Sequence, residues 1–306
     1  MRAAILEAVG TIPVFGDFKE PDEGDGRTVA EVLAAGLNPV DLMIAAGQMG
    51  PVDVPCVVGL EGVARIGDER VYFNGVPWPF GSIAQFAPVD RAEAFPVASD
   101  LSPGMAVALG IAGLAAWVPL ETRAQLQRGE SVLVLGASGM VGQLAVQAAK
   151  LLGAGRVVAA ARHRETLEML RERGADEVVQ LGAGDDADAL RRVAGDGYDV
   201  VLDALYGAAL EAALPATAMG ARAVTVGANA GPAATIPLSS LYGRTLMGHA
   251  GMTVPGDVRR AAYERMGRHA VAGELTVDVV SMPLSDIERA WQAQAGGPHR
   301  KIVIVP

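Results

Sequence analysis

The chain has 306 residues, of which 51% are hydrophobic and 20% are charged, and its formal net charge is −10. This composition excludes a disordered chain, and the negative charge argues against a nucleic-acid backbone or an anionic membrane as partner. The length predicts two domains, and the sole cysteine, Cys56, excludes internal disulfides and multi-cysteine zinc sites.

The first hundred residues predict a compact β domain, because short apolar runs alternate there with clusters of glycine, proline and aspartate. A short helix is expected after the loop that contains Asn38 and Asp41. The expected strands cover residues 1–7, 27–35, 61–66, 70–73 and 82–89.

From residue 130 to residue 250 the pattern changes to alternating strands and helices, which predicts a parallel sheet covered by helices on both faces. Such a sheet binds ligands at the carboxyl ends of its strands. A long helix over 257–272 follows, and the segment 277–306, with a strand at 301–305, is expected to return to the first domain. The expected strands of the sheet end at Leu135, Ala160, Gln180, Asp203, Val226 and Ala250.

Two uncharged stretches, 103–120 and 131–149, reach the length of a membrane span. Glycine and proline interrupt both, so we expect them to form buried core. Glu7 interrupts the apolar N-terminus where a signal peptide would need an unbroken run, so the sequence predicts a cytoplasmic protein.

A glycine-rich turn follows the first strand of the predicted sheet. Its sequence, Gly-Ala-Ser-Gly-Met-Val-Gly over 136–142, precedes a helical pattern over 139–152. Free N–H groups and the positive end of the helix dipole favour a phosphate there. Read strictly, the first position of the G-x-G-x-x-G pattern is Ala137, and a ligand-free structural turn is the alternative. The residues expected to contact a dinucleotide are Ser138, Gly139, Met140 and Val141.

The end of the second strand bears on the choice of cofactor. An NAD site places a carboxylate about 20 residues after the last glycine, whereas an NADP site supplies cations for the 2′-phosphate. Here Ala161, Arg162, His163 and Arg164 occupy that region, and the first carboxylate is Glu165. We therefore predict NADPH as the cofactor; the alternative is that the two arginines are ordinary surface residues.

Further candidate residues follow the later strands of the sheet. Tyr206 and Tyr242 are candidate proton donors, with packing as the alternative role. The four histidines show no spacing typical of a metal site. The expected cofactor contacts at these strand ends are Leu205, Gly227, Ala228 and Asn229.

Seven segments carry a resemblance to a known family: Asn-Pro-Val-Asp at 38–41, Gly-Leu-Glu-Gly-Val-Ala-Arg-Ile at 59–66, Gly-Ser-Ile-Ala-Gln-Phe-Ala at 81–87, Ala-Gly-Leu-Ala-Ala-Trp at 112–117, the strand and glycine turn at 129–142, Asp-Val-Val-Leu-Asp-Ala-Leu-Tyr-Gly at 199–207, and His-Arg-Lys-Ile-Val-Ile-Val-Pro at 299–306. With the order of domains, they make the chain similar to the medium-chain dehydrogenase/reductase superfamily, in its zinc-independent, quinone-oxidoreductase-like branch. The resemblance implies an α/β fold: a Rossmann doubly wound domain over 120–251 and a GroES-like β-rich catalytic domain over 1–119 and 252–306.

The resemblance also implies roles for particular residues. Zinc-dependent relatives have cysteine where Asn38 stands and histidine where Leu60 stands, so no zinc is expected. Asn38 and Asp41 are expected beside the nicotinamide in an interdomain cleft as catalytic residues with Tyr206, and Asn38 also as a cofactor contact; the alternative for both is capping of a helix. A homodimer through the last strand of the sheet, near 246–250, is implied as well.

These observations lead to a predicted function. We expect a zinc-independent oxidoreductase that transfers hydride from NADPH to an electron-poor small molecule, either a quinone or an α,β-unsaturated carbonyl. The alternatives are an enoyl-thioester reductase of the same superfamily and a non-catalytic NADPH-binding sensor or structural protein. No nucleic acid, membrane or metal is expected as partner.

Overall fold

The computed structural model describes residues 1–24 and 26–306, which divide into two compact units. Unit 1 comprises Met1–Ile111, Tyr263–Gly273 and Val277–Pro306, and unit 2 comprises Ala112–Ala262 and Glu274–Thr276. The closing segment thus belongs to unit 1. The division into folding domains at residues 120 and 252 stays a prediction.

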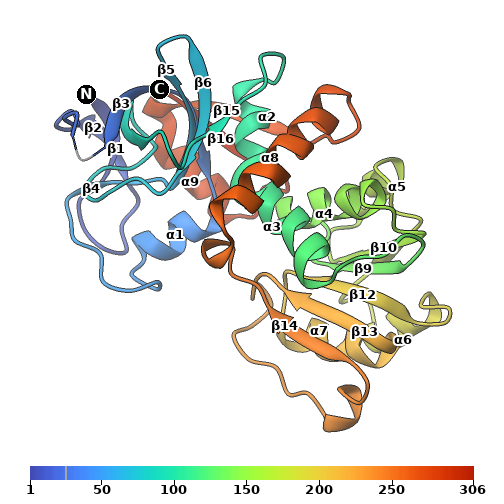
Figure 1. Cartoon of the computed structure of the whole chain (residues 1–306). Helices are drawn as coiled ribbons and strands as arrows, with labels where there is room; N and C mark the ends of the chain where they lie inside the picture. Colours follow the sequence, from blue (N-terminus) through green and yellow to red (C-terminus); the bar gives the residue numbers. More distant parts are fainter. Residues whose placement is uncertain (25) are drawn as a thin grey trace. The chain divides into compact units, whose positions relative to one another are not determined.

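Unit 1 is built around one long strand, β3 (Arg27–Leu37), whose apolar residues alternate with more exposed ones over its first half. It pairs with β16, β5 and β7, all antiparallel, and so brings the last strand of the chain into a sheet of order β15-β16-β3-β5-β6-β8 (Figure 1). A smaller sheet has the order β2-β1-β4. The strands of unit 1 are β1 (Arg2–Leu6), β2 (Val14–Asp17), β3, β4 (Cys56–Val57), β5 (Glu61–Ile66), β6 (Glu69–Asn74), β7 (Phe86–Asp90), β8 (Phe95–Pro96), β15 (Val279–Pro283) and β16 (Lys301–Val305).

Most strands predicted for unit 1 are confirmed, but the strand expected over 82–89 is wrong in its first half. Strand β7 begins only at Phe86. The preceding residues bond to the small sheet instead: Ala4 N donates to Ile83 O at 2.9 Å, and Gln85 N donates to Arg2 O at 3.1 Å. The apolar run 82–89 therefore bonds to β1 of the small sheet with its first half and to β3 of the large sheet with its second half. Alternation of apolar and polar residues alone does not reveal such a change of sheet.

The helices of unit 1 pack on these sheets. Helix α1 (Pro39–Ala45) begins with Pro39 at its first position, and α9 (Ile287–Ala295) lies close to it. Helix α2 (Pro103–Ala108) begins at Ser102, whose hydroxyl accepts from Met105 N, and packs against β3 and β5.

Unit 2 has a parallel sheet of six strands within the described residues, in the order β11-β10-β9-β12-β13-β14. Helices α4 and α5 cover one face, and α6 and α7 cover the other (Figure 1). This is the strand order of a Rossmann fold, and the predicted doubly wound sheet is confirmed. The strands are β9 (Ser131–Leu135), β10 (Arg156–Ala161), β11 (Glu177–Gln180), β12 (Tyr198–Asp203), β13 (Thr217–Thr225) and β14 (Thr245–Gly248). The helices are α3 (Leu114–Val118), α4 (Met140–Leu151), α5 (Arg164–Glu172), α6 (Asp186–Arg192), α7 (Gly207–Ala213) and α8 (Gly256–Val271), the last of which continues into unit 1.

Burial explains why these strands could be recognised. Strands β9, β10 and β12 are buried along almost their whole length, as strands covered on both faces must be. One helical stretch in the described residues, Pro103–Arg123, is long and apolar enough to cross a membrane, and 67% of its apolar window is buried inside the protein. That burial fits the predicted core helix.

Candidate functional site

The glycine turn between β9 and α4 has the geometry of a phosphate cradle. Gly136 turns the chain at φ +79°, and a Cβ on Gly142 would lie 2.5 Å from the Cα of Ala137. Only glycine therefore allows the helix to approach the turn so closely. Gly139 precedes the first residue of α4, so the free N–H groups of this helix begin beside it.

The glycine pattern differs in one respect from the strict sequence pattern. The sharp turn is made by Gly136 rather than by the residue at the next position, Ala137, which is fully buried. The predicted contacts Ser138, Gly139, Met140 and Val141 lie in this turn and in the first turn of α4.

The end of β10 carries two arginines without ion-pair partners. Ala161 is the last residue of the strand and is buried, whereas Arg162, His163 and Arg164 are exposed. In the described part of the chain, the guanidinium groups of Arg162 and Arg164 form no ion pair. Nδ1 of His163 accepts from Thr166 N at 3.3 Å and lies 2.8 Å from Thr166 Oγ1, so this nitrogen caps α5. The free positive charge at this strand end therefore resides in the two arginines.

The end of β12 is organised by a buried carboxylate. Asp203 Oδ1 accepts from the backbone N atoms of Leu205 and Tyr206, both at 2.9 Å, and Oδ2 accepts from Thr225 Oγ1 at 2.9 Å. Burial raises the pKa of Asp203, and these hydrogen bonds oppose that shift. The contacts hold Tyr206 at φ 57°, an uncommon value for a bulky residue.

An apolar cavity of about 590 Å³ lies at the carboxyl ends of β13 and β14. It brings together three residues predicted from the sequence: Tyr206, Gly227 and Ala228. Leu205 and Asn229 belong to the same strand ends without lining it, and Tyr242 is exposed. The cavity is lined by Tyr206, Thr225, Val226, Gly227, Ala228, Pro232, Leu246, Met247, Gly248 and His249.

His249 is a cavity residue that sequence reasoning missed. It follows β14, and its backbone N donates to Thr225 O at 2.9 Å. This histidine lacks the spacing to a second ligand that marks metal-binding histidines in a sequence. Its position directly after a parallel strand was the available signal, because ligands bind at such ends.

Asn38 and Asp41 belong to a buried polar cluster in unit 1. Lys301 Nζ donates to Asn38 Oδ1 at 2.6 Å and to Glu61 Oε1 at 2.8 Å, and Asn38 Nδ2 donates to the same Glu61 oxygen at 2.9 Å. Asp41 Oδ2 accepts from Asn38 N at 2.7 Å. The Asp41 carboxylate thus caps the backbone at the start of α1. The Asn38 side chain is instead held by Lys301 and Glu61.

The cluster continues on the other side of Glu61. Its Oε2 accepts from the Tyr72 hydroxyl at 2.9 Å and from Ile111 N at 2.6 Å. A Cβ on Gly110 would collide with Tyr72 and Glu61, so only glycine brings this backbone N–H to the carboxylate. Burial raises the pKa of Asp41 to about 7, helped by the charge of Glu61 and opposed by the N–H of Asn38 and the charge of Lys301.

The residues at the positions of the zinc ligands do not fit a zinc ion. The carbonyl oxygen of Asn38 accepts from the ammonium of Lys301, whose positive charge would repel a divalent cation. In residues 1–24 and 26–306 no group of three or more His, Cys, Asp and Glu side chains is arranged to hold a metal. The expectation of a metal-free site stays a prediction.

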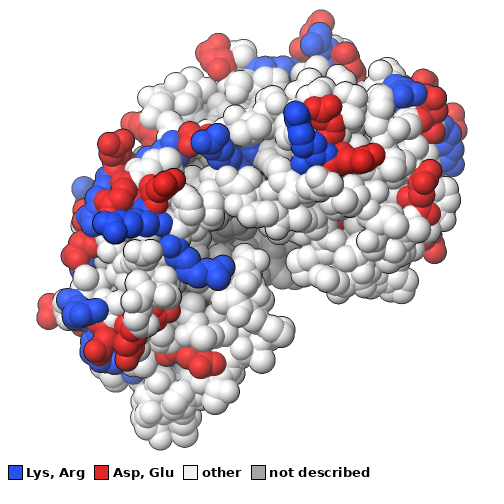
Figure 2. Space-filling view, turned by 180° about the vertical axis from the view of Figure 1, so that it is seen from behind, with Lys and Arg blue, Asp and Glu red and all other residues white. Residues whose placement is uncertain are grey.

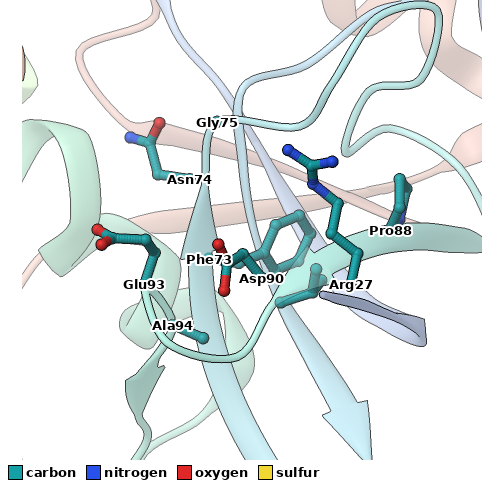
Figure 3. A pocket seen from close by; sticks show the side chains of 9 residues that line it. Arg27, Phe73, Asn74, Gly75, Pro88, Asp90, Glu93 and Ala94 are labelled. Carbon is teal, nitrogen blue, oxygen red and sulfur yellow. The ribbon is translucent and has the colours of Figure 1, made fainter. Parts of the chain in front are cut away.

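A second pocket, of about 230 Å³, lies in unit 1. Figure 3 shows Arg27 and Glu93 on its two sides, with the ring of Phe73 between them in this view. Asp90 and Asn74 complete its polar lining. It contains charges of both signs and none of the residues predicted to bind a cofactor.

Comparisons with known proteins place this architecture among oxidoreductases. Residues 141–268 match the family model described as zinc-binding dehydrogenase. The quinone oxidoreductase of Thermus thermophilus, which was solved alone and in complex with NADPH, is 29% identical, with a TM-score of 0.86 and 100% of both chains covered. The chain is therefore similar over its whole length to an enzyme that binds a nicotinamide cofactor.

Two curated relatives extend the comparison. A phenolphthiocerol/phthiocerol polyketide synthase from Mycobacterium tuberculosis is 31% identical over 303 residues, which cover 92% of this chain and 14% of that protein. Prostaglandin reductase-3 of Bos taurus is 28% identical over 239 residues, which cover 75% of this chain and 63% of that protein. The chain thus spans about a seventh of the first relative and less than two thirds of the second.

Proposed function

Because the chain belongs to the quinone-oxidoreductase-like branch of the medium-chain dehydrogenase/reductase superfamily, we propose that it is an NADPH-dependent reductase that acts without zinc. Its acceptor is a quinone or an α,β-unsaturated carbonyl. The observation that carries this proposal is the apolar cavity at the carboxyl ends of β13 and β14.

The cavity fits a reaction that depends on positioning an apolar acceptor. Its volume of about 590 Å³ is in the range of small-molecule sites, and its walls are mostly aliphatic side chains and glycine. When bound, the cofactor supplies the hydride. The protein then has to hold a flat, apolar acceptor in a fixed orientation, which requires no acid–base pair.

The cofactor would be held along the strand ends of unit 2. Ser138, Gly139, Met140 and Val141 would bind the pyrophosphate through the turn and the start of α4. Leu205, Gly227, Ala228 and Asn229 would hold the nicotinamide half, and we propose Asn38 as a further cofactor contact. For catalysis we propose Asn38, Asp41 and Tyr206, of which Tyr206 lines the cavity.

NADPH is favoured over NADH by the end of β10. Arg162 and Arg164 are exposed, and β10 ends without a carboxylate to bind ribose hydroxyls. Unpaired guanidinium groups suit a 2′-phosphate, which accepts paired, charge-assisted hydrogen bonds. Ala161 and His163 would contact the same part of the cofactor.

We propose a second copy of the chain as the macromolecular partner and the cytoplasm as the compartment. Strand β14 is the edge of the parallel sheet in the described residues, and residues 223–243 carry no charged side chain. Figure 2 shows Lys and Arg interspersed with Asp and Glu, with no extended field of basic side chains on the face in view. Neither a nucleic acid nor a membrane is therefore proposed as partner.

An enoyl thioester is the second candidate acceptor. The match to a 303-residue segment of a polyketide synthase, at 31% identity, favours it. The third candidate is a protein that binds NADPH without catalysing a reaction. Kinetic measurements separate it from the quinone or enone reductase and from the enoyl-thioester reductase.

The test is NADPH oxidation by the purified full chain with three kinds of acceptor: benzoquinones, cyclic and open-chain enones, and crotonyl thioesters. Turnover with quinones or enones supports the proposal, and turnover confined to thioesters supports the second candidate. NADPH binding without turnover across the panel would contradict both and favour the rival.

A further inference from the structure

The cavity at the ends of β13 and β14 contains three polar side chains, and only two of them are available to a ligand. The Thr225 hydroxyl already donates to Asp203 Oδ2 at 2.9 Å. The Tyr206 hydroxyl and the His249 imidazole have no hydrogen-bond partner in the described part of the chain. A ligand in this cavity can therefore meet the Tyr206 hydroxyl and, because Nδ1 of His249 is shielded from solvent, the other ring nitrogen of that histidine.

The His249 ring lacks a partner that the fold would be expected to supply. Its Nδ1 is shielded from solvent and makes no hydrogen bond within residues 1–24 and 26–306. Buried polar atoms in folded proteins nearly always have a partner. The backbone of His249 is nevertheless fixed by its bond to Thr225 O at 2.9 Å, so the residue stands at a defined place beside the cavity.

The electrostatic surroundings keep this imidazole neutral. Burial lowers the pKa of His249, and the positive charge of Arg123 in η2 (Pro119–Arg123) lowers it further. The buried carboxylate of Asp203, which accepts from Thr225 Oγ1 and Tyr206 N, does not reverse this lowering of the pKa. A neutral imidazole has one N–H donor and can polarise a carbonyl group without giving up its proton.

We propose that His249 is a catalytic residue that donates a hydrogen bond from its imidazole N–H to the carbonyl oxygen of the hydride acceptor. The inference rests on the proposed function and narrows it: the acceptor is a carbonyl compound whose oxygen points at His249. Tyr206 is then the second polar contact for the same ligand.

Reduction of an enone in this cavity does not require a positively charged acid. Hydride addition to the β-carbon of an enone shifts the C=C electron pair, so that negative charge collects on the carbonyl oxygen, and the dinucleotide is oxidised to NADP⁺. The N–H of His249 stabilises that oxygen and keeps its proton. A proton from water then adds to the α-carbon and completes the saturated carbonyl product. A preorganised donor at such an oxygen acts more strongly in a dry cavity than in water.

The decisive experiment measures polarisation of a bound carbonyl as well as rate. In the complex with NADP⁺, which cannot donate hydride, 4-(dimethylamino)cinnamaldehyde absorbs at longer wavelength when its carbonyl oxygen accepts a hydrogen bond. We expect this red shift with the parent chain and its loss in His249→Leu. We expect partial recovery in His249→Gln or His249→Asn, because the side-chain amide nitrogens of these residues lie near the two ring nitrogens of histidine and can donate a hydrogen bond from there.

Kinetics and binding complete the test. His249→Leu should lower kcat/KM for enones by about 10²-fold, the cost of one oxyanion donor. NADPH affinity should change less than about twofold, because the cavity donor acts on the acceptor and not on the cofactor. His269→Leu, which removes an imidazole from the last turn of α8, is the matched control and should change neither quantity.

Three results would overturn the inference: no red shift in the parent chain at saturating aldehyde, a red shift that survives in His249→Leu, or loss of NADPH binding in that variant. Failure of the proposed function has a different signature, since the parent chain would then bind NADPH and reduce no acceptor. The red shift in the NADP⁺ complex decides the role of His249 in either case.

Discussion

The ammonium nitrogen of Lys301 lies 2.8 Å from Oε1 of Glu61, and the two side chains are 2% and 0% exposed. Both charges are taken out of water, so the pair is costly to form and still more costly to break. Asn38, Tyr72 and Ile111 N bond to the same two groups, which compensates part of the desolvation.

The first prediction concerns this pair. Lys301→Met leaves the Glu61 carboxylate buried without its counter-ion and should lower the free energy of unfolding by about 3 to 5 kcal/mol. Urea unfolding measures the change. Lys301→Met combined with Glu61→Gln should lose less than Lys301→Met alone, because the uncompensated charge is then gone.

The matched control is an exposed pair of similar geometry. Lys150 Nζ lies 2.6 Å from Asp176 Oδ2, and these side chains are 30% and 43% exposed. Lys150→Met should cost no more than about 1 kcal/mol, because solvent screens this pair. Equal losses of unfolding free energy in Lys301→Met and Lys150→Met would show that burial does not increase the cost of breaking the Lys301–Glu61 pair.

The second prediction follows from the pKa of Asp41, which burial raises from 3.8 to about 7. Between these values the folded chain binds more protons than the unfolded chain, so this group stabilises the fold at low pH and loses that contribution as pH rises through 7. Asp41→Asn has no such proton to lose. Its free energy of unfolding relative to the parent should therefore rise by about 2 to 3 kcal/mol between pH 5 and pH 8.

Denaturant unfolding at several pH values checks this sign. Asp68→Asn, at an exposed turn carboxylate, is the control and should follow the parent across the range. A difference between Asp41→Asn and the parent that stays constant from pH 5 to pH 8 would show that Asp41 keeps an ordinary pKa in the folded chain.

The sequence predicted the parallel sheet well because its strands are buried on both faces. Continuous apolar runs such as 132–135 and 157–160 have few other interpretations, and the predicted ends at Leu135, Gln180 and Asp203 agree with the structure. The glycine turn and the long helix α8 are local patterns of the same kind.

The polar cluster and the cavity could not be predicted in the same way. Lys301 and Asn38 are 263 positions apart in the sequence, and only the pairing of β16 with β3 brings them together. A lysine that opens an otherwise apolar strand was the single local sign of a buried partner. The cavity depends on where loops place side chains after β12, β13 and β14, and no periodic pattern records that.

The third prediction tests the proposed homodimer. Strand β14 pairs with β13 in the structure, and a two-fold contact along its other edge would pair this strand with its copy in antiparallel orientation. Thr245→Lys adds one exposed positive charge to each of the two paired strands, so the dimer should dissociate.

Light scattering coupled to size exclusion measures the mass. The control is Gln180→Lys, which adds the same charge at the end of β11, the opposite edge of the sheet. A parent chain with the mass of a monomer, or dissociation by Gln180→Lys alone, would contradict a contact through β14.

The fourth prediction concerns the choice of cofactor. Arg162 is exposed at the end of β10, and removing one charge-assisted hydrogen bond to a phosphate costs about 1.5 to 3 kcal/mol, or roughly 10- to 100-fold in Kd. Arg162→Ala should therefore weaken NADPH binding by that factor and leave NADH binding nearly unchanged. Titration of the cofactor fluorescence with each variant gives both constants.

Arg164 provides an internal repeat of this test, and Arg171 its control. Arg164→Ala should weaken NADPH binding in the same direction, because its guanidinium is also free of ion pairs in the described residues. Arg171 lies on the same helix but pairs with Glu168 at 3.1 Å, so Arg171→Ala should leave both Kd values unchanged. Equal loss of NADH and NADPH affinity in the Arg162 and Arg164 variants would mean that these arginines bind a group common to both cofactors, and the 2′-phosphate would then have no cation at this strand end.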